Sequence, residues 1–171
     1  MNQNIRILCY LSTMDSIDRK LLSLLQDDAS MPLQDVAARV GLSVNPCWRR
    51  IKRMESEGII RARVAVLDPE KVGLHVTVFV RIKIREHTAE WVKRFASAIR
   101  SIAEIAECHR MGGDVDYMLK VIVADIAGYD RVYKELIAKV PGLADVSALF
   151  SMERIKYTTK IEPPQGKDDS R

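Results

Sequence analysis

The sequence predicts an α+β protein made of a helical N-terminal part and a mixed C-terminal part. Three observations support this prediction. Residues 14–58 hold three short segments with apolar residues at helical spacing. Residues 74–160 alternate between strand and helix patterns in the order β-α-β-β-α-β. Between them, the breaker pair Asp68-Pro69 marks a change of composition.

Length and composition limit what the chain can be. Its 171 residues, 47% of them hydrophobic, suffice for one or two packed domains. No apolar run approaches the roughly 18 residues of a membrane span, so no membrane partner is expected. Three cysteines without a Cys-x-x-Cys pair, and no secretory signal, indicate a reduced cytoplasmic protein.

The first two helices follow from their ends and their apolar spacing. Asp15 and Asp18 can form a capping box before a stripe that runs to about Asp27. The residues of this stripe are Ile17, Leu21, Leu24 and Leu25. A second helix is predicted over residues 33–40 and ends at Gly41. Its inward residues are Leu33, Val36, Ala37 and Val40, and Pro32 offers it no side-chain cap.

The third helix combines an apolar face with a cluster of positive charge. Ser43 is the predicted cap, Pro46 fits the first turn, and Gly58 ends the helix. One side is apolar through Cys47, Ile51 and Met54. The net charge is +4 and the pI about 9.0, with four basic residues between positions 49 and 53. Two helices, a glycine turn and a cationic helix predict a helix-turn-helix unit that fits a DNA major groove.

The C-terminal part predicts a ferredoxin-like βαββαβ domain. Strands are expected over residues 76–84, 105–111, 116–124 and 145–157, and helices over 89–102 and 126–140. We divide the chain into an extension (1–13), the helix-turn-helix domain (14–60), a hinge strand and linker (61–73), the βαββαβ domain (74–160) and a disordered tail (161–171). The strand pattern that contributes to the hinge begins at Ile59.

Two blocks of residues resemble the Lrp/AsnC (feast/famine) family of transcriptional regulators. The first contains Val40-Gly41-Leu42-Ser43, Pro46-Cys47, Arg50-Ile51-Lys52-Arg53-Met54-Glu55 and Gly58-Ile59-Ile60; the second contains Glu107-Cys108-His109, Met111, Gly113-Asp114, Asp116-Tyr117 and Leu119. The ending Met152–Thr159 resembles the branch that includes cysteine-responsive regulators. Residues 1–13 have no counterpart in this pattern, so we expect native translation to begin at Met14.

The resemblance implies a winged-helix-like DNA-binding domain followed by an effector-sensing (RAM) domain. For DNA, the positions near the start of the third helix are expected to read bases: Ser43, Asn45, Trp48 and Arg49. Packing of Trp48 at the edge of the core stays open as an alternative. Three later residues are expected to contact phosphates or brace the helix: Arg50, Lys52 and Arg53. Cys47 is expected to be a buried apolar residue rather than a sensor.

The turn between the second and third strands is the expected effector site. In the resembled family this loop helps to form an amino-acid pocket between subunits. That role is carried here to Met111, Gly112, Gly113, Asp114, Asp116 and Tyr117. Backbone N–H groups of a glycine turn can hold a carboxylate, and Asp114 or Asp116 can pair with an ammonium group. Turn capping by these aspartates is the alternative.

The leading hypothesis is a cytoplasmic, nucleoid-associated regulator of amino-acid metabolism genes. It is not expected to be an enzyme, since no nucleophile–base pair or phosphate loop is present. No metal or cofactor is expected, because Cys108 and His109 point to opposite faces of a strand. A partly apolar sheet face predicts a homodimer. The resemblance implies further assembly to an octamer. The alternatives are a DNA-wrapping nucleoid protein with little ligand response, and a metabolic regulatory subunit that binds no DNA.

Overall fold

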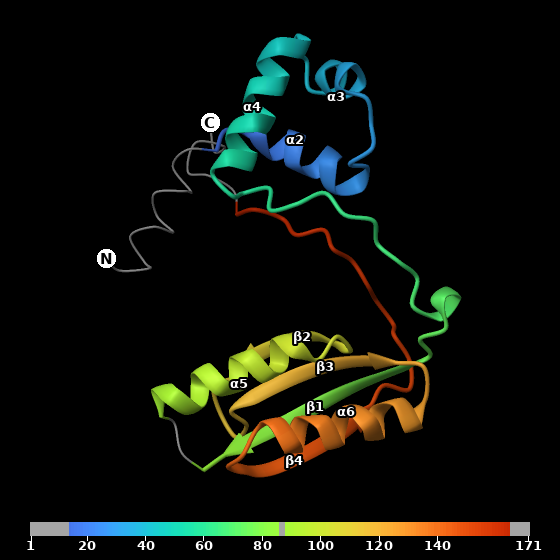
Figure 1. Ribbon diagram of the computed structural model, residues 1–171. Coiled ribbons are helices and arrows are strands. Elements are labelled where there is room, and N and C mark those ends of the chain that lie inside the picture. Colours follow the sequence, from blue (N-terminus) through green and yellow to red (C-terminus); the bar gives the residue numbers. More distant parts are fainter. Residues whose placement is uncertain (1–13, 86–87, 165–171) are drawn as a thin grey trace. The chain divides into compact units, whose positions relative to one another are not determined.

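The computed structural model describes residues 14–85 and 88–164, which form two compact units (Figure 1). The first unit contains the chain up to Ala65 together with the segment that begins at Lys156. The second unit spans Val66–Ile155. The predicted extension at residues 1–13 and the end of the predicted tail, residues 165–171, lie outside the described residues.

Three helices build the first unit: α2 (Ser16–Asp27), α3 (Leu33–Arg39) and α4 (Val44–Ser56). The predicted capping box is confirmed, because the Asp15 carboxylate accepts the Asp18 N–H at 2.8 Å and the Asp18 carboxylate accepts the Asp15 N–H at 3.3 Å. The core of this unit is formed by one face of each helix: Leu21, Leu22, Val36, Ala37, Cys47, Ile51 and Met54.

The structure corrects the predicted buried face of α2 and shows how α3 and α4 begin. Leu22, not Leu24, joins the core from α2, because Asp18, Leu21, Leu22 and Leu25 lie at the spacing of one helical face. Ser43 is the N-cap residue of α4 as predicted, but its side chain makes no capping hydrogen bond. Pro32 is the N-cap of α3 and likewise provides no side-chain bond. The chain begins α3 through the Pro32 carbonyl, which accepts from Asp35 and Val36.

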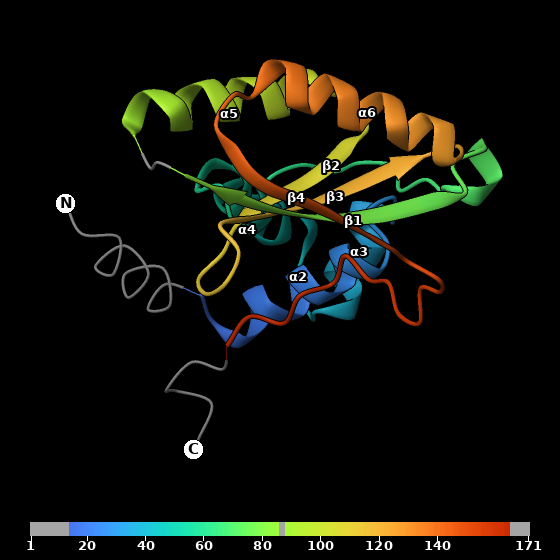
Figure 2. The same ribbon diagram turned by 90° about the horizontal axis from the view of Figure 1, so that it is seen from below.

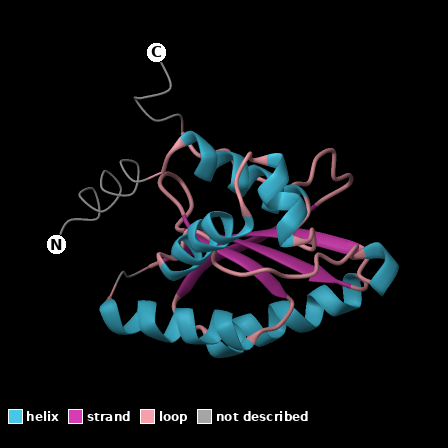
Figure 3. Cartoon of the chain, turned by 90° about the horizontal axis from the view of Figure 1, so that it is seen from above, coloured by secondary structure: helices cyan, strands magenta, loops and turns pink. Residues whose placement is uncertain are grey.

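A four-stranded antiparallel sheet in the order β2-β3-β1-β4 forms the second unit. The strands are β1 (Val76–Ile84), β2 (Ile105–Arg110), β3 (Tyr117–Val123) and β4 (Leu143–Phe150), and the helices are α5 (Ala89–Ser101) and α6 (Ile126–Lys139). Both helices cover the same face of the sheet (Figures 2 and 3). This order and layering confirm the predicted ferredoxin-like βαββαβ fold.

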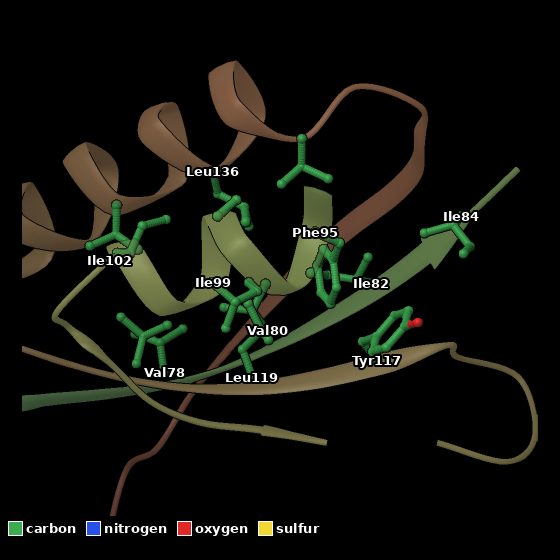
Figure 4. Close-up of a cluster of buried hydrophobic side chains, with 14 of the residues drawn as sticks. Val78, Val80, Ile82, Ile84, Phe95, Ile99, Ile102, Tyr117, Leu119 and Leu136 are labelled. Carbon is green, nitrogen blue, oxygen red and sulfur yellow. The ribbon is translucent and has the colours of Figure 1, made fainter. Parts of the chain in front are cut away.

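The core of the second unit lies between this sheet face and the two helices (Figure 4). Alternate residues of β1 point into it, beginning with Val78, Val80 and Ile82. Phe95 of α5 packs against Tyr117, with ring centroids 4.4 Å apart. Trp91 anchors the start of α5, because its indole N–H donates to the Pro141 carbonyl at 2.7 Å.

Three predicted features of the connecting segments were wrong. The hinge strand expected from Ile59 onward is absent, because a strand requires a neighbour and the described residues offer this segment none. A short 3-10 helix, η1 (Glu70–Val72), follows it. β4 ends at Phe150 instead of residue 157, since Ser151 already donates to Thr77 near the start of its partner β1. The predicted disordered tail begins too early, because Ile161 is hydrogen-bonded to Gln26 of α2.

Candidate DNA-binding surface and effector loop

One side of α4 is fully presented to solvent. Asn45, Trp48, Arg49 and Lys52 are all exposed and follow the i, i+3, i+4, i+7 spacing of a single helical stripe. Cys47, Ile51 and Met54 are buried on the opposite side and fix the helix to its own unit. Trp48 is half exposed and lies outside the core cluster, so the alternative of packing at the core edge is not realised. The structure therefore gathers a polar, aromatic and cationic stripe on one helix.

Arg50 and Arg53 occupy the flank of α4 and bind the first turn of α2. The Arg50 guanidinium lies 2.6 Å from the Asp15 carboxylate and 2.9 Å from that of Asp18. The Arg53 guanidinium lies 2.5 Å from the second Asp18 oxygen. Asp18 is buried, and both of its oxygens accept charge-assisted hydrogen bonds. This network braces the cationic helix against α2, which is one of the two roles predicted for these arginines.

The electrostatics of this network favour its charged form. Burial works to raise the pKa of Asp15, but hydrogen bonds from the Asp18 N–H and the Arg50 guanidinium outweigh it and lower that pKa. The hydrogen bonds that Arg50 donates to the carboxylates of Asp15 and Asp18 raise the pKa of Arg50, and the bond to Asp15 has the larger effect. A hollow of about 520 Å³ lies beside the network, lined by Asp15, Pro46, Arg49, Arg50 and Arg53. Arg53 Nε is buried and has no hydrogen-bond partner among the described residues.

Ser43 and Lys52 are the remaining residues predicted to contact DNA, and Lys52 belongs to the exposed stripe. Ser43 precedes the first turn and is exposed. Lys52 forms an ion pair with Glu55 one turn later, at 2.7 Å. Such an exposed pair is weak and exchanges readily with other charges. Lys52 therefore keeps a cation on the stripe that can also meet a phosphate.

Sequence reasoning missed the burial of Asp18, although the sequence contained a signal for it. The capping-box interpretation placed Asp18 at the helix start, where a carboxylate is normally exposed. Its spacing of three, four and seven residues from Leu21, Leu22 and Leu25 puts it on the buried face. Two arginines spaced three apart on a neighbouring helix are the complementary signal, since a buried carboxylate needs partners.

The predicted effector loop is a hairpin turn between β2 and β3. Met111, Gly112, Gly113 and Asp114 are exposed at its tip. Gly113 has φ of 121°, a backbone conformation that a side chain would strain. The Met111 N–H donates to the Asp116 carbonyl at 2.9 Å and closes the turn. The loop thus offers an exposed glycine backbone beside a carboxylate.

Asp116 and Tyr117 have structural contacts of their own. The Asp116 carboxylate accepts the Ile84 N–H at 2.8 Å, and the Asp116 N–H donates to the Ile82 carbonyl at 2.9 Å. These bonds attach the loop to the end of β1. The Tyr117 ring is buried against Phe95 on the helix-covered face (Figure 4). The Trp91 ring also lies near it, with ring centroids 6.1 Å apart. Asp116 therefore performs the turn-supporting role that was the alternative for it, while Asp114 stands exposed at the tip.

Two free cysteines lie in the described part of the chain, Cys47 in the first unit and Cys108 in the second. Cys47 is buried, as expected of a small apolar residue, and burial raises the pKa of its thiol. Cys108 pairs with Leu119 and His109 with Met118, so the two side chains leave opposite faces of β2. Within residues 14–85 and 88–164, no three His, Cys, Asp or Glu side chains group as a metal site. None of the helices in this part of the chain has the length and apolarity to cross a membrane.

Family models match both units of the chain. A winged helix-turn-helix DNA-binding model matches residues 14–61, which contain α2, α3 and α4. A model of the Lrp/AsnC ligand binding domain matches residues 77–161, which contain the two helices and all of the sheet except Val76. The exposed stripe on α4 and the hairpin loop lie within these two matches, respectively.

Individual proteins are similar over nearly the whole chain. The DNA-binding transcriptional activator DecR of Escherichia coli K12 is 49% identical over 86% of this chain and 97% of its own length. The glutamate uptake regulatory protein of Zymomonas mobilis is 45% identical, over 91% and 94%. The crystal structure of an AsnC family transcriptional regulator from Agrobacterium tumefaciens superimposes with a TM-score of 0.83 and 53% identity, over 86% and 96%. The complex of a Neisseria meningitidis transcriptional regulator with L-Met gives 0.81 and 32%, over 89% and 97%. The chain therefore belongs to the Lrp/AsnC family of transcriptional regulators.

Proposed function

We propose that this protein binds specific double-stranded DNA through the exposed stripe of α4 and changes its DNA affinity when a small amino acid binds. The stripe is the observation that supports the proposal most directly, because asparagine and arginine side chains are presented together on a helix anchored from behind. A single helix of this kind fits the major groove, where each base pair shows a distinct pattern of donors and acceptors.

The contacts on DNA divide by position on α4. Ser43, Asn45, Trp48 and Arg49 lie at or near its start, where a recognition helix approaches base edges. Arg50, Lys52 and Arg53 lie further along and are assigned to the phosphates. The cationic hollow supports this assignment, because the side chains of Arg49, Arg50 and Arg53 line it together and a phosphate carries the opposite charge.

The effector is proposed to be a free amino acid held at the hairpin loop. Met111, Gly112, Gly113 and Asp114 would contact it, with Asp116 and Tyr117 shaping the loop from below. An exposed glycine backbone suits a carboxylate, and Asp114 suits an ammonium group. The similarity to a regulator solved with L-Met and to a glutamate uptake regulator supports this ligand class.

Assembly is proposed to bring two α4 helices onto one DNA site. The face of the sheet away from α5 and α6 carries exposed Phe79 and Leu149, which are paired neighbours on β1 and β4. A second copy of the chain would cover this face and form a homodimer, which can assemble further to an octamer with the effector between subunits. The assembly would act on the DNA of the nucleoid in the cytoplasm.

A DNA-binding assay with each of the 20 proteinogenic amino acids tests the proposal. DNA is first selected from a random-sequence pool and then titrated alone and with each amino acid, L-cysteine and L-methionine included. We expect one fragment to bind at least 1000-fold tighter than random DNA, on the order of known specific binding, and one amino acid to shift that affinity. A steep salt dependence with little sequence preference would instead identify a DNA-wrapping protein. Absence of DNA binding under all conditions would refute the proposal.

The loop assignment has its own test by calorimetry with the amino acid so identified. Asp114→Ala should abolish the heat of binding, since it removes the exposed carboxylate. Asp116→Asn retains an acceptor for the Ile84 N–H and serves as the matched variant with an intact turn. Unchanged affinity in Asp114→Ala would remove this residue from the site.

A further inference from the structure

The chain returns to the first unit after it leaves β4. We call residues Lys156–Ile161 the C-terminal strap; it is drawn in red and runs to α2 (Figures 1 and 2). The Gln26 side chain of α2 binds both backbone groups of one strap residue. Its Oε1 accepts the Ile161 N–H at 2.8 Å, and its Nε2 donates to the Ile161 carbonyl at 3.0 Å. The Gln26 amide thus offers the Ile161 backbone one acceptor and one donor, as a neighbouring strand does in a sheet. This pair of bonds determines which residue of the strap lies against Gln26.

A charged contact stands beside this amide. Lys160 Nζ lies 2.7 and 2.9 Å from the two oxygens of Asp27. The last turn of α2 has no basic residue, and Asp27 and Asp28 follow one another at its negative end. Carboxylates at a helix C-terminus are unfavourable, so Lys160 supplies the cation that the helix itself lacks. The Lys160 N–H also donates to Thr158 Oγ1 at 3.0 Å, which bends the strap locally.

The contacts that join Lys160 and Ile161 to α2 are polar and largely exposed to solvent. Ile161 is about three-quarters exposed, so its side chain contributes little apolar burial. The Lys160 and Asp27 side chains are also partly exposed, and an ion pair of this kind weakens as salt is added. The strap can therefore dock and detach without unfolding α2.

Strap docking changes how the two units are connected. The first connection, residues 61–75, contains only the short η1 as regular structure and by itself leaves the units wide freedom of orientation. A docked strap adds a second connection, residues 151–159, which runs from β4 to Lys160. Two connections that must be satisfied together permit fewer arrangements than one.

We propose that the docked C-terminal strap is a second tether between the two units. It limits how the first unit, here called the DNA-reading unit, can orient relative to the second unit, here called the sensor unit. The strap is continuous with β4, an edge strand whose pairing with β1 ends at Val78–Phe150. A consequence of this tether rests on the proposed function: the tether determines how strongly an amino acid bound to the sensor unit changes the affinity for DNA.

Single-molecule energy transfer between the two units tests the tether without DNA or effector. Dyes are attached through non-natural amino acids at the exposed positions Glu57 and Lys134, and each labelled chain is mixed with excess unlabelled chain. The variants are Gln26→Ala, Asp27→Lys, Lys160→Glu and the exchange Asp27→Lys/Lys160→Glu. Arg94→Glu reverses another exposed ion pair, on α5, and is the matched control.

The wild type should give a narrow distribution of transfer efficiency that broadens in each single variant and at high salt. The charge exchange should restore the narrow distribution, and Arg94→Glu should not alter it. Hydrogen exchange at the Ile161 amide should accelerate at least tenfold in Gln26→Ala, with circular dichroism unchanged. An equally broad wild type, unaffected single variants, or failure of the exchange to restore would overturn the tether.

A second measurement separates this proposal from the function on which its consequence rests. The ratio of DNA affinities with and without the identified amino acid should fall towards one in Lys160→Glu and recover in the exchange variant. A wild type without any amino-acid response would refute the proposed function, while the energy-transfer result would still decide the tether. A tether that detaches without changing the ratio would refute the consequence.

Discussion

Asp18 is the buried carboxylate of the DNA-reading unit, and it forms ion pairs with both Arg50 and Arg53. Removing its carboxylate leaves the charges of Arg50 and Arg53 without their shared partner. Breaking a buried ion pair from one side costs about 3 kcal/mol when the stranded charges can turn partly to water. We expect Asp18→Ala to lower the free energy of unfolding of this unit by about that amount. Hydrogen exchange of the Leu21 and Leu22 amides measures it. Asp35→Ala, an exposed aspartate on α3, should change it little; equal losses would show that the network is not responsible.

Asp15 makes the same network sensitive to acid. Its pKa is lowered in the folded protein from the ordinary 3.8, although burial alone would raise it, because the Asp18 N–H and Arg50 bind the charged form. A lowered folded pKa gives stability that is complete above 3.8 and is lost as the pH falls through the folded value. Asp15→Asn keeps a good cap but removes this charge. The stability gap between wild type and Asp15→Asn should therefore exist at about pH 6 and close below the folded pKa. A gap that is independent of pH would contradict the assignment.

At the scale of elements, α4 separates the exposed residues that we propose to read DNA from the residues that hold the helix in its unit. Arg49 is exposed on the stripe, and its guanidinium matches guanine. We expect Arg49→Ala to reduce discrimination between selected and random DNA by about 1–3 kcal/mol without changing stability. Lys52→Ala should weaken binding to all sequences alike and reduce the salt slope by about one. Titrations of both variants at several salt concentrations distinguish these results. Equal losses of Arg49→Ala on both DNAs would show that Arg49 contacts only phosphate.

The elements also show how far a sequence determines a structure. Regular elements with one buried face were predictable, because their apolar spacing is set by their own residues, as in α4 and β1. Features that depend on partners elsewhere in the chain were not. The strand expected after Ile59 lacks a neighbour, β4 stops where β1 begins, and the strap depends on Gln26 meeting a backbone 135 residues away. In the proposed DNA-binding surface, the exposed stripe followed from spacing. The spacing of Asp18 also places it on the buried face of α2, but its partners Arg50 and Arg53 follow only from the packing of α4 against α2.

On the scale of the whole molecule, the sheet of the second unit is covered on one side only. The helices α5 and α6 pack on Val78, Val80 and Ile82, while alternate residues of β1 leave the other face. Phe79 and Leu149 lie side by side on that face and are respectively 38% and 51% exposed. Phe79 and Leu149 thus form an exposed apolar patch, which a two-fold axis could place against the same patch of a second copy.

The proposed dimer is therefore expected to depend on this face rather than on the helices. Phe79→Asp together with Leu149→Asp places like charges where the copies meet and should convert the dimer to a monomer at micromolar concentration, as measured by sedimentation velocity. Val92→Asp alters a residue of α5 that is 40% exposed and should leave the mass unchanged, because that helix faces away from the proposed contact. The monomeric variant should also bind a selected DNA site much more weakly than the wild type, since one α4 helix reads only half of a two-fold site. A monomeric wild type, or dissociation caused by Val92→Asp instead, would place the contact elsewhere.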